Sequence, residues 1–125
     1  MRDLTIIMDH TRGRPANLLE AIAARGVTVQ AGCLFSRIDE RVAHVAVDDS
    51  EVAAVRAAAT ETGCVLADER ECAFVPPGFE GGVAAMARRI ADAGGTVTVA
   101  YYAENGGVVM STTDPALATK LFGES

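Results

Sequence analysis

The sequence predicts an α+β fold in which a β-α-β-β-α unit occurs twice. The main observation is an internal repeat, because residues 13–26 and 81–94 align without gaps. Equivalent positions of the two copies carry identical or similar residues, namely Gly13 and Gly81, Leu18 and Met86, Ile22 and Ile90, and Gly26 and Gly94. A second observation is that each copy leads into a β-branched triplet, 27–29 or 97–99. In both copies a glycine precedes a helix and the helix is followed by a strand. This recurrence indicates a duplicated unit.

The composition is that of a folded protein with an aliphatic core. A length of 125 residues suits one compact domain or two small fused ones. Half of the residues are hydrophobic but only 5% are aromatic, so the core consists of Ala, Val, Ile and Leu, and disorder is excluded. A net charge of −6, with one lysine among eleven basic residues, argues against nucleic-acid binding.

The sequence also predicts a cytoplasmic protein with reduced thiols. The longest apolar stretch near the start, residues 4–8, is too short to span a bilayer, and no signal peptide is visible, so we expect no membrane partner. Three cysteines without C-x-x-C spacing, Cys33, Cys64 and Cys72, are typical of buried thiols rather than of a disulfide framework or a zinc site.

The first copy reads as strand, helix, two strands, helix and strand. Pro15 suits the first turn of a helix, and Gly26 suits its C-terminal cap. Asp48 and Glu51 have the spacing of a capping box before a second helix. The expected elements are a strand at 4–8, a loop at 9–13, a helix at 15–25, a strand at 27–35, a turn at 36–40, a strand at 41–47, a helix at 52–62 and a strand at 64–67.

The second copy follows the same order but ends sooner. Asn105 and two glycines provide the positive φ angles of a hairpin, and Asp114 precedes a helix that begins at Pro115. The expected elements are a strand at 72–75, a loop at 76–82, a helix at 83–93, strands at 97–102 and 108–112, and a last helix from 115. The predicted repeats are residues 1–70 and 71–125, the second without a last strand of its own. One long strand over 65–75 and a tight turn near Asp68 both fit the sequence.

This order is the split β-α-β arrangement of ferredoxin-like domains, which places two helices on one face of an antiparallel sheet. The strands are apolar on both faces, as in 27–29 and 108–110. We therefore expect the second face to be covered by the sister repeat or by a second chain, and we predict a homodimer.

The two copies resemble tandem ACT domains, which are small amino-acid-sensing modules of metabolic regulators. The first copy carries the resemblance in Asp9, Gly13, Leu18, Leu19 and the run 25–28, and the second carries it in Gly81, Met86 and the run 93–97. The resemblance covers about residues 3 to 122. The family's proline before the glycine is replaced, by Arg12 in the first copy and by Glu80 in the second.

The resemblance implies an amino-acid ligand at the loop that starts the first helix of each copy. A glycine lets the backbone approach a ligand, and free N–H groups at a helix start favour a carboxylate. Asp9 would hold the ammonium group. The implied ligand-binding residues are Asp9, His10, Thr11, Arg12, Gly13, Arg14 and Asn17 in the first copy, and Phe79, Glu80, Gly81 and Gly82 in the second. The alternative is that both glycines only shape a turn.

No catalytic, metal or cofactor site is expected. Only two histidines are present, His10 and His44, and the serines lie outside any nucleophile-elbow motif. Two function classes remain. The chain is either a regulatory sensor that binds an amino acid or related small carboxylate, or a structural module that mediates oligomerisation without a ligand.

Overall fold

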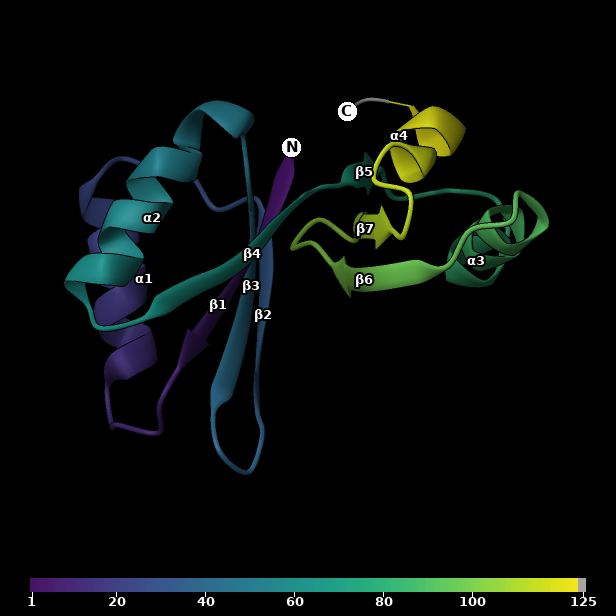
Figure 1. Cartoon of the computed structure of the whole chain (residues 1–125). Coiled ribbons are helices and arrows are strands. Elements are labelled where there is room, and N and C mark those ends of the chain that lie inside the picture. Colours follow the sequence, from purple (N-terminus) through teal and green to yellow (C-terminus); the bar gives the residue numbers. More distant parts are fainter. Residues whose placement is uncertain (124–125) are drawn as a thin grey trace. The chain divides into compact units, whose positions relative to one another are not determined.

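The computed structural model describes residues 1–123, which form two compact units. We call residues 2–69 the first unit, and the residues from Arg70 onward, together with Met1, the second unit. Each unit combines one antiparallel sheet with helices (Figure 1). This arrangement confirms the predicted α+β fold class.

The first unit has the order β-α-β-β-α-β. Its elements are β1 (Arg2–Met8), α1 (Arg14–Ala24), β2 (Ala31–Ser36), β3 (Arg41–Val47), the short 3-10 helix η1 (Asp49–Glu51), α2 (Val52–Glu61) and β4 (Val65–Glu71), whose last two residues belong to the second unit. The strands lie in the order β2-β3-β1-β4, and both helices cover one face of the sheet (Figure 1). Strand β2 is therefore an edge strand, next to β3.

The core of the first unit lies between this sheet face and the two helices. Leu4 and Ile6 of β1 pair with Val45 and Ala43 of β3, so these four side chains share the helix-facing side. Leu18 and Ile22, one turn apart on α1, are each 1% exposed and pack on them. The strand predicted at residues 41–47 is confirmed, and Ala43, Val45 and Val47 of it belong to this core.

The second unit repeats the first, with one strand fewer among its described residues. Its elements are β5 (Ala73–Val75), α3 (Gly82–Asp92), β6 (Val97–Tyr102), β7 (Val108–Thr112) and α4 (Leu117–Phe122). The strand order β5-β7-β6 matches β1-β3-β2 of the first unit. Met86 and Ile90, the counterparts of Leu18 and Ile22, are buried against β5 and β7.

Several local expectations differ from the structure. The last helix begins at Leu117 and not at Pro115. Residues 27–30 form no strand, since pairing with β3 begins only where the Gln30 N–H donates to the Ala46 carbonyl at 2.9 Å. The predicted capping box is wrong, because the Glu51 carboxylate instead accepts from the Thr28 N–H at 3.2 Å. Within 65–75 the chain forms two strands, β4 and β5, separated only by Cys72.

Candidate functional site

The loop between β1 and α1 ends at a glycine in the left-handed region. Gly13 has φ 82° and ψ −2°, and it caps α1 without any side-chain hydrogen bond. Gly81 has φ 84° and ψ −4° at the same place before α3. Positive φ favours glycine because a Cβ would meet the backbone. The repeat seen in the sequence is therefore a repeat of loop geometry.

Asp9 of the first loop is bound by its own neighbours. Its Oδ1 accepts from the Thr11 N–H at 2.9 Å and from Arg14 Nε at 3.3 Å, and its Oδ2 pairs with Arg14 Nη2 at 3.1 Å. Hydrogen bonds from Arg14 and Thr11 hold the pKa of the Asp9 carboxyl well below its usual range. The carboxylate is thus ionised and shared with Arg14, while its side chain stays 59% exposed.

Arg14 also ties the loop to the end of α2. Its Nη1 donates to the Thr62 carbonyl at 2.9 Å, and a Cβ on Gly63 would come within 2.6 Å of that nitrogen. The pairing with Asp9 raises the pKa of Arg14. Thr62 was not among the predicted site residues, and it lies 48 positions from Arg14 in sequence, so no local pattern indicates the contact.

Two further contacts join the loop to the β2–β3 hairpin. Arg41 Nη2 donates to the Asp9 carbonyl at 2.9 Å and to the Thr11 carbonyl at 2.6 Å. His10 donates from Nε2 to the Arg37 carbonyl at 3.0 Å. His10 is therefore occupied in holding the loop. Arg41 is a second residue that sequence reasoning did not find.

Fewer backbone donors are free at the start of α1 than the sequence suggested. The Arg14 N–H donates to the Thr11 carbonyl and the Asn17 N–H to the Gly13 carbonyl, while Pro15 has no N–H. Within the described residues, the N–H groups of Gly13 and Ala16 have no partner. Arg12 is exposed and makes no ion pair among the described residues.

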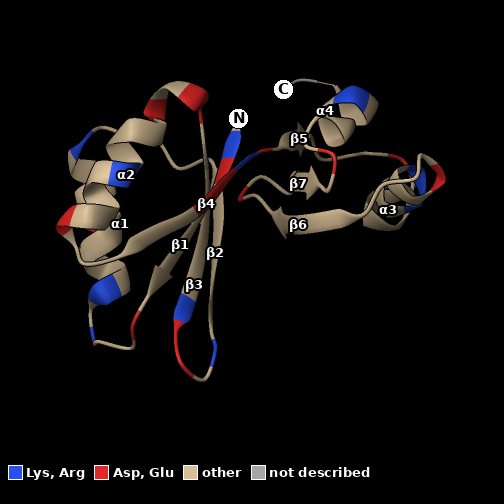
Figure 2. Ribbon diagram, in the orientation of Figure 1, with Lys and Arg blue, Asp and Glu red and all other residues tan. Residues whose placement is uncertain are grey.

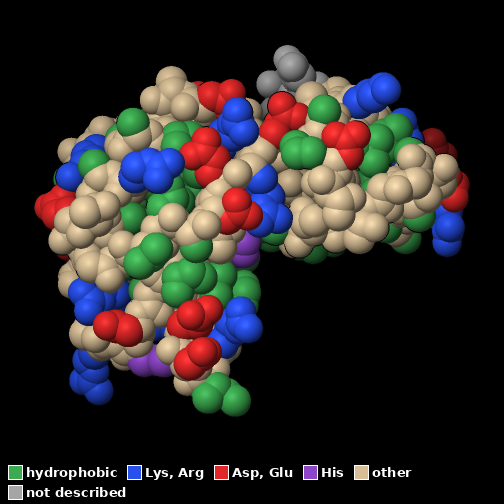
Figure 3. Space-filling model, in the orientation of Figure 1, with side chains coloured by type: hydrophobic (Ala, Val, Ile, Leu, Met, Phe, Trp, Pro, Cys, Tyr) green, Lys and Arg blue, Asp and Glu red, His purple; other side chains and the backbone are tan. Residues whose placement is uncertain are grey.

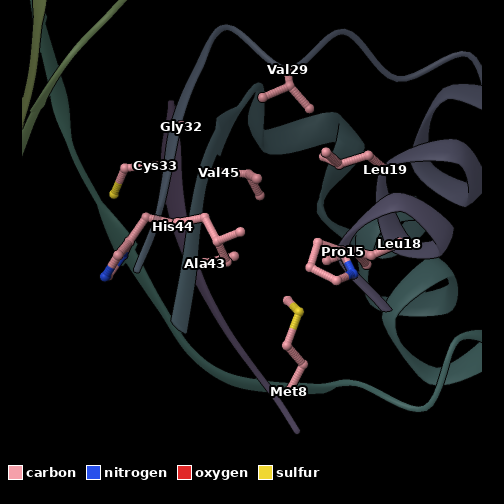
Figure 4. Close-up of a pocket in the computed structure, with 11 residues that line it drawn as sticks. Met8, Pro15, Leu18, Leu19, Val29, Gly32, Cys33, Ala43, His44 and Val45 are labelled. Carbon is pink, nitrogen blue, oxygen red and sulfur yellow. The ribbon is translucent and has the colours of Figure 1, made fainter. Parts of the chain in front are cut away.

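An apolar pocket of about 300 Å³ lies beside this loop, between α1 and the strands β2 and β3 (Figure 4). Met8 and Pro15, which flank the loop on either side, both line it. The other lining residues are Leu18, Leu19, Val29, Gly32, Cys33, Leu34, Ala43, His44 and Val45. Figure 4 shows the Cys33 sulfur and the His44 ring pointing away from the pocket, so aliphatic side chains surround it.

The matching place in the second unit holds a smaller pocket, of about 120 Å³. Gly82, the first residue of α3, lines it together with Phe79, Met86 and Tyr102. Gly81 precedes the helix, and Glu80 is exposed with no residue of opposite charge paired to it in the described chain.

Phe79 of that second loop is already packed. Its ring meets Phe122 edge-on at 5.6 Å, and the Arg89 guanidinium lies over both rings, at 5.8 Å from Phe79 and 5.1 Å from Phe122. Arg89 also donates to the Leu121 carbonyl at 2.9 Å. Phe79 therefore helps to fix α4 against α3.

The remaining charged and thiol groups do not converge. Figure 2 shows the basic and acidic positions scattered along the ribbon of the described residues, without a continuous basic stretch. The face in Figure 3 likewise mixes charged and hydrophobic side chains. His44 Nδ1 lies 3.1 Å from the buried Asp3 carboxylate. Among the described residues no three His, Cys, Asp or Glu side chains are placed to hold a metal ion, and none of the helices there is long and apolar enough to cross a membrane.

Two of the solved structures that resemble this chain cover nearly all of it. Protein BT0572 from Bacteroides thetaiotaomicron superposes with a TM-score of 0.76, at 17% identity, over 96% of this chain and 84% of that one. The regulatory subunit of aspartate kinase from Thermus thermophilus, in its ligand-free form, superposes with a TM-score of 0.70, at 14% identity, over 97% of this chain and 87% of that one. No protein-family model matches the sequence, and no curated protein matches it significantly. At these identities the likeness establishes the fold, and the resemblance to tandem ACT domains is confirmed at that level: the chain has the ACT-type ferredoxin-like fold, made twice.

Proposed function

We propose that this protein is a small regulatory sensor, without catalytic activity, that binds an amino acid or related small carboxylate at the Asp9–Asn17 loop. The observation that carries the proposal is the loop itself. Between Asp9 and Ala16 it places an ionised carboxylate, an exposed arginine and two N–H groups without a partner among the described residues, next to an apolar pocket of about 300 Å³. Ligand sites typically combine an apolar hollow with a few polar groups.

Each polar group of an amino acid has a partner in this loop. The ammonium group would approach the Asp9 carboxylate, which has unused lone pairs after its three hydrogen bonds. The carboxylate would accept from the N–H groups of Gly13 and Ala16, where the helix dipole also favours negative charge. Arg12 would add a charge-assisted bond.

The fold supports a regulatory role, since one solved structure that superposes over 97% of this chain is the regulatory subunit of an aspartate kinase. We propose residues 1–70 and 71–125 as the two repeats. We also propose a homodimer, because the edge strand β2 and the turn after it expose Leu34 (49%), Phe35 (47%) and Ile38 (103%). An edge strand with exposed apolar side chains favours pairing with another chain.

Those same exposed side chains favour a second candidate function, in which the chain only mediates association and the loop is a structural turn. The internal hydrogen bonds of Asp9, His10 and Arg41 are consistent with such a turn. The two candidates differ in one property, which is ligand binding.

A thermal-shift screen of the twenty amino acids, followed by calorimetry, tests the proposal. A ligand at a hundred times its Kd adds about 2.7 kcal/mol to the free energy of unfolding. We expect one class of amino acids to raise Tm, and the Asp9→Asn variant to bind at least tenfold more weakly. The control is Asp39→Asn, which removes an exposed carboxylate in the β2–β3 turn. If no amino acid binds the wild type, or if Asp9→Asn binds equally well, the loop is structural.

A further inference from the structure

The pocket beside α1 has a wall that matches a specific kind of side chain. Leu18 and Leu19 of α1, Val29 of the following loop, and Ala43 and Val45 of β3 all turn aliphatic groups toward its centre (Figure 4). Met8 closes the end next to Asp9, and Figure 4 shows no charged side chain directed into it. A ligand group that enters this pocket is transferred from water into a hydrocarbon environment.

That environment discriminates between amino acids by their side chains. A charged or amide side chain would lose its hydrogen bonds to water without replacement, and this desolvation disfavours binding. An aliphatic, thioether or phenyl side chain gains from burial, about fourfold in affinity for each methylene. The volume of about 300 Å³ is at the lower end of the range for small-molecule sites, which suits one amino acid.

The two units differ at this place, so the duplication does not imply two equal sites. The corresponding pocket in the second unit is less than half as large, at about 120 Å³. Its loop carries Glu80 where the first loop carries Arg12, and a carboxylate there repels the carboxylate of a ligand. Phe79 is held by Phe122 and Arg89.

We infer that the first unit binds one free amino acid with a large apolar side chain, of the leucine, isoleucine, methionine or phenylalanine class, and that the chain has a single such site. The side chain occupies the pocket between α1 and β3 while the Asp9–Asn17 loop holds the ammonium and carboxylate groups. This inference rests on the proposed function, to which it adds the ligand class and the stoichiometry.

Isothermal titration of the full chain with leucine, phenylalanine, alanine, glutamate and lysine tests it. We expect leucine to bind at one site per chain and alanine to bind roughly 50-fold more weakly, since alanine lacks three buried carbons. Glutamate and lysine should show no binding in the concentration range that saturates leucine. Tighter binding of alanine, glutamate or lysine, or two sites per chain, overturns the inference while the proposed function stands. If none of the twenty amino acids binds, both are overturned.

A charged substitution in the pocket wall tests whether the ligand binds in this pocket. Leu19 is 52% exposed, so Leu19→Glu should fold, and a circular-dichroism melt checks this. We expect Leu19→Glu to weaken leucine binding at least tenfold. The matched control is Val65→Glu, which places the same charge at an exposed hydrophobic position of β4, outside both the pocket and the proposed dimer surface, and should bind as the wild type does. Equal leucine affinity in a folded Leu19→Glu variant and in the wild type excludes this pocket.

Discussion

Gly13 and Gly81 have nearly the same left-handed backbone, with φ of 82° and 84°, but different surroundings. A Cβ on Gly13 would meet no heavy atom within 4 Å, whereas a Cβ on Gly81 would lie 2.7 Å from the Cβ of Ala85. The two loops share a backbone shape that the duplication preserved, and they differ in the space around it. The space next to Gly13 is therefore open, whereas Ala85 of α3 fills the equivalent space next to Gly81.

This difference predicts unequal costs for one substitution. Gly13→Ala should lower the free energy of unfolding by about 1–2 kcal/mol, since only the unfavourable φ contributes. Gly81→Ala should cost more, because the added methyl also collides with Ala85. Urea unfolding of both variants measures the comparison. Adding Ala85→Gly to Gly81→Ala removes the collision, and equal costs for the two single variants would contradict the steric argument.

The cysteines should differ in reactivity. Cys33 is exposed, whereas Cys64 and Cys72 are buried, so a thiol reagent should modify one site rapidly in the native protein. Partial burial and the nearby charge of Asp3 raise the pKa of the Cys33 thiol, although a hydrogen bond with the His44 backbone opposes this. The rate of Cys33 modification should therefore rise with pH, and the midpoint of this rise should lie above the usual thiol pKa of about 8.5. Cys33→Ser should abolish the fast phase, and a midpoint at or below that value would disagree.

The pairing of Asp9 with Arg14 predicts a pH dependence at low pH. A carboxyl group whose pKa is lower in the folded than in the unfolded protein stabilises the fold. The stabilisation is complete at a pH above the unfolded-state pKa and is lost as the pH falls through the folded-state pKa. The difference in Tm between the wild type and Asp9→Asn should stay constant from pH 7 to about 5 and shrink at lower pH. A carboxyl NMR titration should give Asp9 a midpoint below the usual Asp value of about 3.9. A normal midpoint would show that the ion pair is absent in solution.

Leu19 and Ile22, which lie one turn apart on α1, differ in burial. Ile22 is 1% exposed and packs in the core, so Ile22→Ala should lower the free energy of unfolding by about 2–5 kcal/mol. Leu19, one turn earlier, is 52% exposed, and Leu19→Ala should cost under about 1 kcal/mol. Thermal unfolding of the two variants gives the comparison. Similar losses would mean that Leu19 is buried in solution, for example by a second chain.

The repeat in the sequence predicted the fold because helix periodicity and strand alternation are local. Ile22 and Ile90 lie on equivalent buried faces, and β3, β6 and β7 begin and end where expected. The local pattern misled at 27–29, because β-branched residues also suit an extended loop that packs on a core. Glu51 matched a capping box by spacing, but its carboxylate had a tertiary partner in Thr28.

The sequence predicted where the proposed ligand-binding loop lies, but it did not predict the hydrogen bonds that hold this loop. Asp9 and Gly13 indicated its position, but several contacts that hold it come from Arg41 and from the Thr62 carbonyl, which are distant in sequence. The pocket wall likewise combines α1, β2 and β3. Such a hollow depends on side chains brought together by the sheet order, so the apolar stripe of the first helix indicated only one side of it.

The placement of the aromatic residues in β6 has a spectroscopic consequence. The chain has no tryptophan and two tyrosines, Tyr101 and Tyr102, and both lie in this strand of the second unit. Intrinsic tyrosine emission therefore reports on the second unit, while far-ultraviolet circular dichroism reports on both. Unfolding curves from the two signals will coincide only if the units unfold together. Their divergence would give the stability of each unit from one unlabelled sample.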